Sequence, residues 1–181
     1  MPDSATDPRA EFYVLARDVL RNVATELLQH YSNGNAIALE PEQVPSNDEF
    51  VLAAAIGFAG PSLNGTLAVA FRRPLLDRLS PLTGMPQELA HGDWIGELSN
   101  QLLGRLKNKL VPYGLDIRLG TPAVVEGREL RLYASGKGHI EQRFRIAQSV
   151  VCVWLDMIVG EDLSIQKTED STGDEGSVIL F

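Results

Sequence analysis

Four residues between positions 93 and 104 have types and spacing that suit a binding or catalytic surface. Asp93, Glu97, Asn100 and Gly104 follow one another at steps of four, three and four residues, which places them on one face of a helix. Two carboxylates and a carboxamide then lie on successive turns, and the next turn carries no side chain. A carboxamide both donates and accepts hydrogen bonds and does not titrate. We interpret this face as a contact surface.

A solvated helix face is the plainer alternative for Glu97 and Asn100. Such a face more often carries Glu–Lys pairs, and it more often has a better helix former than glycine, which costs about 1 kcal/mol relative to alanine. For Asp93 the alternative is capping or charge compensation near the helix N-terminus.

A long helix is needed to hold these side chains in register, and the sequence predicts one over residues 86–111. Its second face is an apolar stripe that suits packing on a sheet. Pro112 and Gly114 are expected to end it. The stripe consists of Ile95, Leu98, Leu102 and Leu106.

The first half of the chain supplies the support for that helix. A helix is predicted over residues 8–31, ended by the Asn33-Gly34-Asn35 cluster, and a short strand over 36–39. A hairpin follows, with strands at 50–58 and 66–71 and Asn64-Gly65 as the strongest turn signal. A short helix is expected over 73–82.

The second half is strand-rich. A strand over 115–126 is expected to be broken at Thr121-Pro122, because proline cannot join a central ladder, and turns are expected at 126–128 and 136–138. Another strand is predicted over 129–134, and residues 142–159 are expected to form one long strand, kinked within 147–151. Grouped helices and paired strands predict an α+β fold, with long helices packed on a largely antiparallel sheet.

Composition limits the possible function classes. The 181 residues have a net charge of −8 and a hydrophobic content of 44%, which fits one globular domain. We assign residues 8–160 to that domain, 1–7 to a disordered N-terminus, and 161–181 to a flexible tail whose six acids against one base supply −5. The absence of a basic stripe argues against nucleic-acid binding. No apolar run is long enough to cross a membrane.

The sequence shows no other set of residues that could form a complete catalytic site by itself. The single cysteine, Cys152, lies in an apolar run and is not expected to act as a nucleophile. The three histidines are far apart, without metal-ligand spacing. Gly57–Gly60 lacks the lysine and the following helix of a phosphate-binding loop. The lone cysteine and the lack of a secretory signal predict a cytoplasmic protein.

The spacing of the polar face resembles the motif of the CheC/CheX/FliY family of chemotaxis phosphatases. In that motif an Asp or Ser is followed by three residues, Glu, two residues, Asn, about twenty-one residues and a Pro. Here it reads Asp93-x3-Glu97-x2-Asn100-x21-Pro122. The order of the expected elements over residues 8–160 also fits, and the single-unit length most resembles CheX.

The resemblance implies a hydrolase that removes the phosphoryl group from the phospho-aspartate of a CheY-like receiver domain. Glu97 would pair with the receiver's active-site lysine, and Asn100 would orient the attacking water. Asp93 and Pro122 match supporting positions, and we expect Pro122 to break the strand edge even if the motif is real. The protein would need no cofactor of its own, since the receiver carries Mg²⁺.

Two further expectations concern the partner. Gly104 would let the partner's backbone come close, and Arg105, Lys107 and Lys109 could meet acidic residues at the receiver's rim. The resemblance also implies a homodimer whose sheets join, and the apolar run 150–159 is a plausible pairing edge. The alternative function is a non-catalytic binding or dimerisation module that sequesters a receiver without hydrolysis.

Overall fold

The computed structural model describes residues 7–40, 50–80, 87–130, 138–163 and 165. The predicted disordered N-terminus before Asp7 and the acidic tail after residue 165 lie outside the described residues, as does the expected turn at 136–138 apart from Gly138. The helices and strands are α1 (Pro8–Tyr31), β1 (Ala36–Leu39), β2 (Phe50–Ala59), β3 (Leu63–Phe71), α2 (Arg73–Leu79), α3 (Gln87–Leu110), the 3-10 turn η2 (Val111–Tyr113), β4 (Arg118–Leu119), β5 (Ala123–Leu130), β6 (Gly138–Ile146) and β7 (Ser149–Val159).

One seven-stranded sheet organises the molecule. Its strands run in the order β1-β6-β7-β3-β2-β4, and β5 pairs with the same edge of β2 as β4 does. Every pairing is antiparallel. The predicted α+β class with an antiparallel sheet is therefore confirmed.

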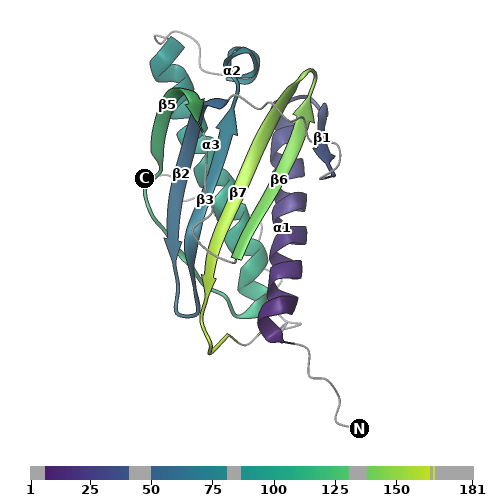
Figure 1. Cartoon of the computed structure of the whole chain (residues 1–181), viewed down its shortest axis with the longest axis vertical. Coiled ribbons are helices and arrows are strands. Elements are labelled where there is room, and N and C mark those ends of the chain that lie inside the picture. The colour runs from purple at the N-terminus through teal and green to yellow at the C-terminus, as the bar shows by residue number, and fades with distance from the viewer. Residues whose placement is uncertain (1–6, 41–49, 81–86, 131–137, 164, 166–181) are drawn as a thin grey trace.

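Both long helices cover the same face of this sheet. Figure 1 looks onto the opposite face, with α1 and α3 behind the strands. α3 contacts β2 and β3, whereas α1 contacts β1 and β6, and the two helices also touch each other. α1 carries an apolar stripe that is buried at Phe12, Ala16, Val23 and Leu27. The core consequently lies between this helix pair and the sheet.

The alanines of β2 divide between the two faces. Ala54 is fully buried in the core on the helix side, where its small side chain lets a helix pack close to the sheet. Ala53 belongs to a smaller cluster with Cys152 and Trp154 on the other face. Because side chains alternate along a strand, only every second alanine can meet the helices.

The long strand predicted over 142–159 is wrong, because the chain reverses within it. β6 and β7 form a hairpin in which Ile146 pairs with Ser149. Ala147, in the turn, has a φ of 54°, a left-handed conformation that non-glycine residues seldom adopt. β7 pairs with β6 on one side and β3 on the other, so the expectation that 150–159 forms a pairing edge is also wrong.

Two turn predictions in the other hairpin and in β5 are corrected as well. Asn64 and Gly65 lie inside β3, paired with Ala59 and Phe58. A Cβ on Gly65 would stand 2.2 Å from the carbonyl oxygen of Asp156, so glycine serves a close strand approach there rather than a turn. Residues 126–128 continue β5 with a register shift opposite β2. The predicted break at Thr121-Pro122 is confirmed, because it separates β4 from β5.

No helix among the described residues is long and apolar enough to cross a membrane.

Candidate functional site

The surface that carries the motif is built on α3. Its predicted apolar stripe is almost completely buried, with Ile95 fully covered and Leu102 only 2% exposed. Burial of this stripe fixes the rotation of the helix, so the opposite face must point outward. After Leu110 the chain makes a 3-10 turn and leaves through Gly114, which has a φ of 77°. The predicted helix of 86–111 is thus confirmed to within one residue at each end.

The four motif positions of α3 reach the outer surface together. Asp93 and Glu97 are exposed, and Asn100 and Gly104 are half-buried. Neither Asp93 nor Asn100 makes a side-chain hydrogen bond or ion pair with another described residue. Their polar groups are therefore available to solvent or to a partner.

Glu97 is held by a relay of two hydrogen bonds that sequence reasoning missed. The Nε2 of Gln101 donates to Oε1 of Glu97 over 3.0 Å. The hydroxyl of Tyr31, at the end of α1, donates to Oε1 of Gln101 over 3.3 Å. The i, i+4 spacing of Glu97 and Gln101 was a signal for the first bond. No sequence signal indicated Tyr31, because that residue lies on another helix.

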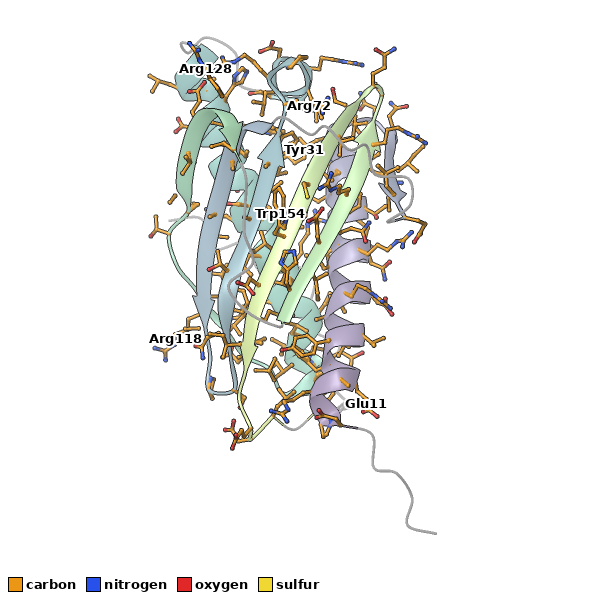
Figure 2. The ribbon with its side chains drawn as sticks, viewed as in Figure 1. Glu11, Tyr31, Arg72, Arg118, Arg128 and Trp154 are labelled. Atoms are coloured by element: carbon orange, nitrogen blue, oxygen red, sulfur yellow. The ribbon has the colours of Figure 1, made fainter. Side chains whose placement is uncertain are left out.

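The ring of Tyr31 is fixed by an aromatic cluster. It stands edge-to-face against Trp94, with ring centroids 5.6 Å apart, and Trp94 in turn packs against Phe71 at 5.3 Å. Such edge-to-face pairs contribute a stabilising free energy in addition to that of burying the rings, and they favour one ring orientation. Trp94 is 3% exposed and belongs to the core. Figure 2 shows where Tyr31 lies relative to the sheet.

Pro122 lies against the same helix. Its Cγ would be 3.9 Å from a Cβ built on Gly96, and a methyl group of Val124 would be 3.7 Å away. Gly96 belongs to the helical turn between Asp93 and Asn100. The break between β4 and β5 thus brings Pro122 beside the polar face, although it is about twenty-two positions later in the chain than Asn100.

Gly104 differs from Gly96 in its surroundings. A Cβ on Gly104 would meet no other atom within 4 Å. Packing inside the chain therefore does not require glycine here, and helix propensity disfavours it.

Basic residues follow the motif toward the end of α3, but two of them already have acidic neighbours. Arg105 lies 3.9 Å from Glu26 of α1, and Lys107 lies 2.9 Å from Asp116. These pairs are largely solvent-exposed, so each contributes little to stability and can exchange partners.

Other candidate chemical groups lie apart from this surface. Burial raises the pKa of the Cys152 thiol far above its usual range, so the thiolate needed for nucleophilic attack is not formed. The buried His91 places its Nε2 3.3 Å from a carboxylate oxygen of Asp77. Within the described ranges no three His, Cys, Asp or Glu side chains come together as a metal site would require.

The comparisons with known proteins agree with the fold. A family model described as chemotaxis phosphatase CheX matches residues 52–145, a span that contains most of β2, all of α3 and Pro122. None of the curated proteins matches the chain.

Several solved structures share the architecture. The chemotaxis protein CheX from Vibrio vulnificus is 17% identical, with a TM-score of 0.65 over 79% of this chain and 96% of that chain. A chemotactic CheC-like protein from Shewanella oneidensis is 20% identical, with a TM-score of 0.66 over 78% and 96%. A CheX–CheY–BeF₃–Mg²⁺ complex from Borrelia burgdorferi matches at 14% identity, with a TM-score of 0.65 over 77% and 96%. At these identities the likeness shows a common fold.

Proposed function

Because this chain belongs to the chemotaxis phosphatase CheX family, we propose that it dephosphorylates the phospho-aspartate of a CheY-like receiver domain. The observation that carries the proposal is that the family match includes α3, on whose outer face Glu97 and Asn100 are both accessible. The complex of CheX with CheY from Borrelia burgdorferi, which has the same fold, supports a receiver as the partner.

The reaction is a hydrolysis of an acyl phosphate. A water molecule attacks phosphorus, the bond from phosphorus to the aspartate oxygen breaks, and inorganic phosphate and the free carboxylate are released. The receiver supplies Mg²⁺ and a lysine to neutralise the charge on the phosphoryl oxygens. This protein then needs only to place the water in line with the breaking bond, which is catalysis by positioning.

Asn100 is the residue that we assign to the water. Its carboxamide can accept a hydrogen bond from the water and donate one to a phosphoryl oxygen, and it keeps this ability at every physiological pH. No described residue occupies the amide in the free protein. A hundredfold acceleration requires about 2.7 kcal/mol, which one well-placed polar group can supply.

Glu97 is assigned to the receiver's lysine. Gln101 occupies only its Oε1, so among the described residues Oε2 has no partner and can accept from an ammonium group. An ion pair formed away from water on docking is stronger than one on an open surface. Glu97 therefore contributes to binding and orientation, while Asn100 contributes to the chemical step.

Three further positions support the contact. Asp93 extends the polar face by one turn toward the helix N-terminus. Gly104 leaves space in which the receiver's backbone can approach, and Pro122 braces the turn of α3 around Gly96.

The assignment of roles can be tested with a phosphorylated receiver and Mg²⁺. Asn100→Ala should abolish turnover and retain binding to a beryllofluoride-treated receiver, whereas Glu97→Ala should weaken binding. Asn108→Ala, which removes an exposed amide from the same helix, is the matched control and should leave both unchanged. Full activity of Asn100→Ala would remove that residue from the mechanism. Binding without acceleration by the wild-type protein would instead identify a sequestering module.

A homodimer remains a proposal. The family resemblance suggests that two sheets join at an edge, and the described sheet has its edges at β1 and at β4–β5. Light scattering of the purified protein would test it, and a monomeric mass at assay concentration would exclude the dimer.

A further inference from the structure

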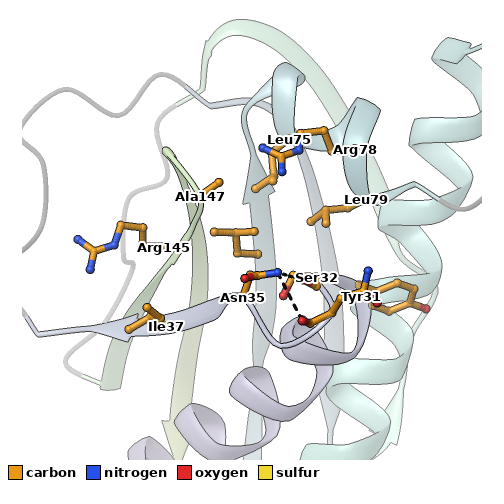
Figure 3. Close-up of a pocket in the computed structure, with 11 residues that line it drawn as sticks. Tyr31, Ser32, Asn35, Ile37, Leu75, Arg78, Leu79, Arg145 and Ala147 are labelled. Carbon is orange, nitrogen blue, oxygen red and sulfur yellow. Dashed lines mark hydrogen bonds between the residues drawn. The ribbon is translucent and has the colours of Figure 1, made fainter.

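A cavity of about 430 Å³ lies at one end of the sheet, apart from the motif surface. The C-terminal end of α1, β1, α2 and the end of β6 with the β6–β7 turn border this open cavity, as Figure 3 shows. None of the motif residues lines it. The described lining consists of Tyr31, Ser32, Asn33, Asn35, Ile37, Leu75, Arg78, Leu79, Arg145, Ile146 and Ala147.

Ser32 provides a buried polar group in this cavity. The residue is 6% exposed, and its hydroxyl finds no hydrogen-bond partner among the described residues. The amide of the neighbouring Asn35 donates instead to the Ser32 carbonyl over 2.7 Å. A buried hydroxyl without a partner destabilises a fold, because it has lost its bonds to water. A ligand that hydrogen-bonds to this hydroxyl would restore the lost interaction.

The charge of the cavity is positive, although the chain as a whole carries −8. Arg78 and Arg145 border it, and no described acidic residue lines it. Neither arginine makes an ion pair within the described ranges. In Figure 3 the guanidinium of Arg78 lies over the cavity, whereas that of Arg145 points away from it. Arg78 can therefore reach an occupant directly, and Arg145 adds to the field that attracts one.

The rest of the lining is mixed, because Asn33 and Asn35 add polar groups and four leucine and isoleucine side chains supply its apolar part. Leu75 and Leu79 of α2 and Ile146 of β6 belong to that apolar part, and Figure 3 shows the ring of Tyr31 on the side nearest α3. The volume falls in the usual range for sites that bind small organic ligands, and an apolar strip beside polar groups suits a ligand that has both an apolar body and a charged group. Guanidinium groups recognise carboxylates and phosphates through paired hydrogen bonds.

We propose that this cavity binds a small organic anion. Its carboxylate or phosphate lies between the Arg78 guanidinium and the Ser32 hydroxyl, and its apolar or aromatic body lies along Leu75, Leu79 and Ile146. This site is separate from the receiver contact, and the proposal does not depend on the phosphatase activity.

Calorimetric titration of the full chain tests the proposal, with phenyl phosphate, benzoate and neutral benzyl alcohol as probes. Saturable binding of either anion but not of the alcohol is expected, and the tighter anion distinguishes a phosphate from a carboxylate ligand. Arg78→Gln should weaken binding tenfold or more, since charge-assisted hydrogen bonds are the strongest in such sites. The control Arg118→Gln removes the same charge near the other end of the sheet (Figure 2) and should change nothing.

Ser32→Ala separates ligand binding from a structural role. It removes an unpaired buried hydroxyl, so the melting temperature should stay equal or rise, while affinity for the anion should fall about fivefold. Three results would overturn the proposal. The first is that neither anion saturates the protein at concentrations up to about 10 mM, which is well above the dissociation constant of about 1 mM of a weak small ligand. The second is that benzyl alcohol binds as tightly as the anions. The third is that the Arg78 and Arg118 variants lose the same affinity for the anion.

Discussion

Gly104 offers a perturbation whose effects on stability and on activity should have opposite signs. In Gly104→Ala the added methyl group meets no atom of the chain within 4 Å, so it costs no steric strain. Inside a helix, alanine is about 1 kcal/mol more favourable than glycine where the methyl group causes no clash. For a chain of 181 residues this should raise the melting temperature by about 2–4 °C.

The same methyl group should impair the proposed reaction. If the receiver's backbone packs against Gly104, the methyl group overfills a tight interface, which typically costs about 1–3 kcal/mol. The ratio kcat/KM would then fall about 5- to 150-fold, mainly through KM, because Asn100 and Glu97 are unchanged.

The two effects should be measured on the same preparations. Thermal unfolding gives the effect on stability, and release of phosphate from a phosphorylated receiver over a range of receiver concentrations gives the effect on activity. Gly92→Ala is the matched control, since a Cβ there also meets nothing within 4 Å and Gly92 is not a motif position. Gly92→Ala should raise the melting temperature as much as Gly104→Ala does and leave turnover of the receiver unchanged. A destabilised Gly104→Ala would refute the placement of Gly104 on an open helix face. A stabilised variant with undiminished kcat/KM would refute its contact with the receiver.

The remaining predictions concern the relay, the core and the thiol. Tyr31→Phe removes the hydroxyl that supports Gln101 and keeps the ring. The KM for the receiver should therefore rise about fivefold, the equivalent of about 1 kcal/mol, with kcat unchanged. An unaltered KM would mean that Glu97 needs no such support. Leu98→Ala should lower the free energy of unfolding by about 3–5 kcal/mol in urea, whereas Leu89→Ala, at a residue 60% exposed, should change it by less than about 0.5 kcal/mol. Because burial raises the pKa of its thiol, Cys152 should not react with Ellman's reagent at pH 8 until the protein is unfolded, and rapid reaction of the native protein would show that the thiol is accessible.

The long helices were the most predictable part of the fold. The apolar stripe between Phe12 and Leu27 repeats over the whole length of α1, and the first helix was predicted with the bounds that the structure has. Asp7 accepts a hydrogen bond from the backbone N–H of Arg9 and caps the start, and Pro8 suits the first turn. Long stripes of this kind are reliable because every turn repeats the same signal.

The β6–β7 hairpin could not be recognised from the sequence. Its turn contains Ala147 and Gln148, neither of which is a usual turn residue, and Ala147 takes a positive φ without glycine's freedom. β7 is buried on both faces, because Val151 and Val153 belong to the main core and Cys152 and Trp154 to the smaller cluster. A doubly buried strand shows no alternation, so nothing in its pattern marked where it began.

The candidate site also has a part that the sequence could predict and a part that it could not. Residues that share α3, such as Glu97 and Asn100, have a fixed spatial relation that helical spacing reveals. Tyr31 is seventy positions from Gln101, and only the packing of α1 beside α3 brings the two together. The cavity at Ser32 and Arg78 could not be predicted from the sequence either, since its walls come from four separate elements.

The most direct test of the phosphatase function is the rate of phosphate loss from a phosphorylated CheY-like receiver in Mg²⁺, measured with this protein at a small fraction of the receiver concentration. We expect the whole phosphorylated pool to decay faster than the receiver's own rate, with many receivers turned over per molecule of protein and with no acceleration by Asn100→Ala. A decay that equals the receiver's own rate, for each cognate receiver offered, would contradict the proposal that this chain is a phosphatase.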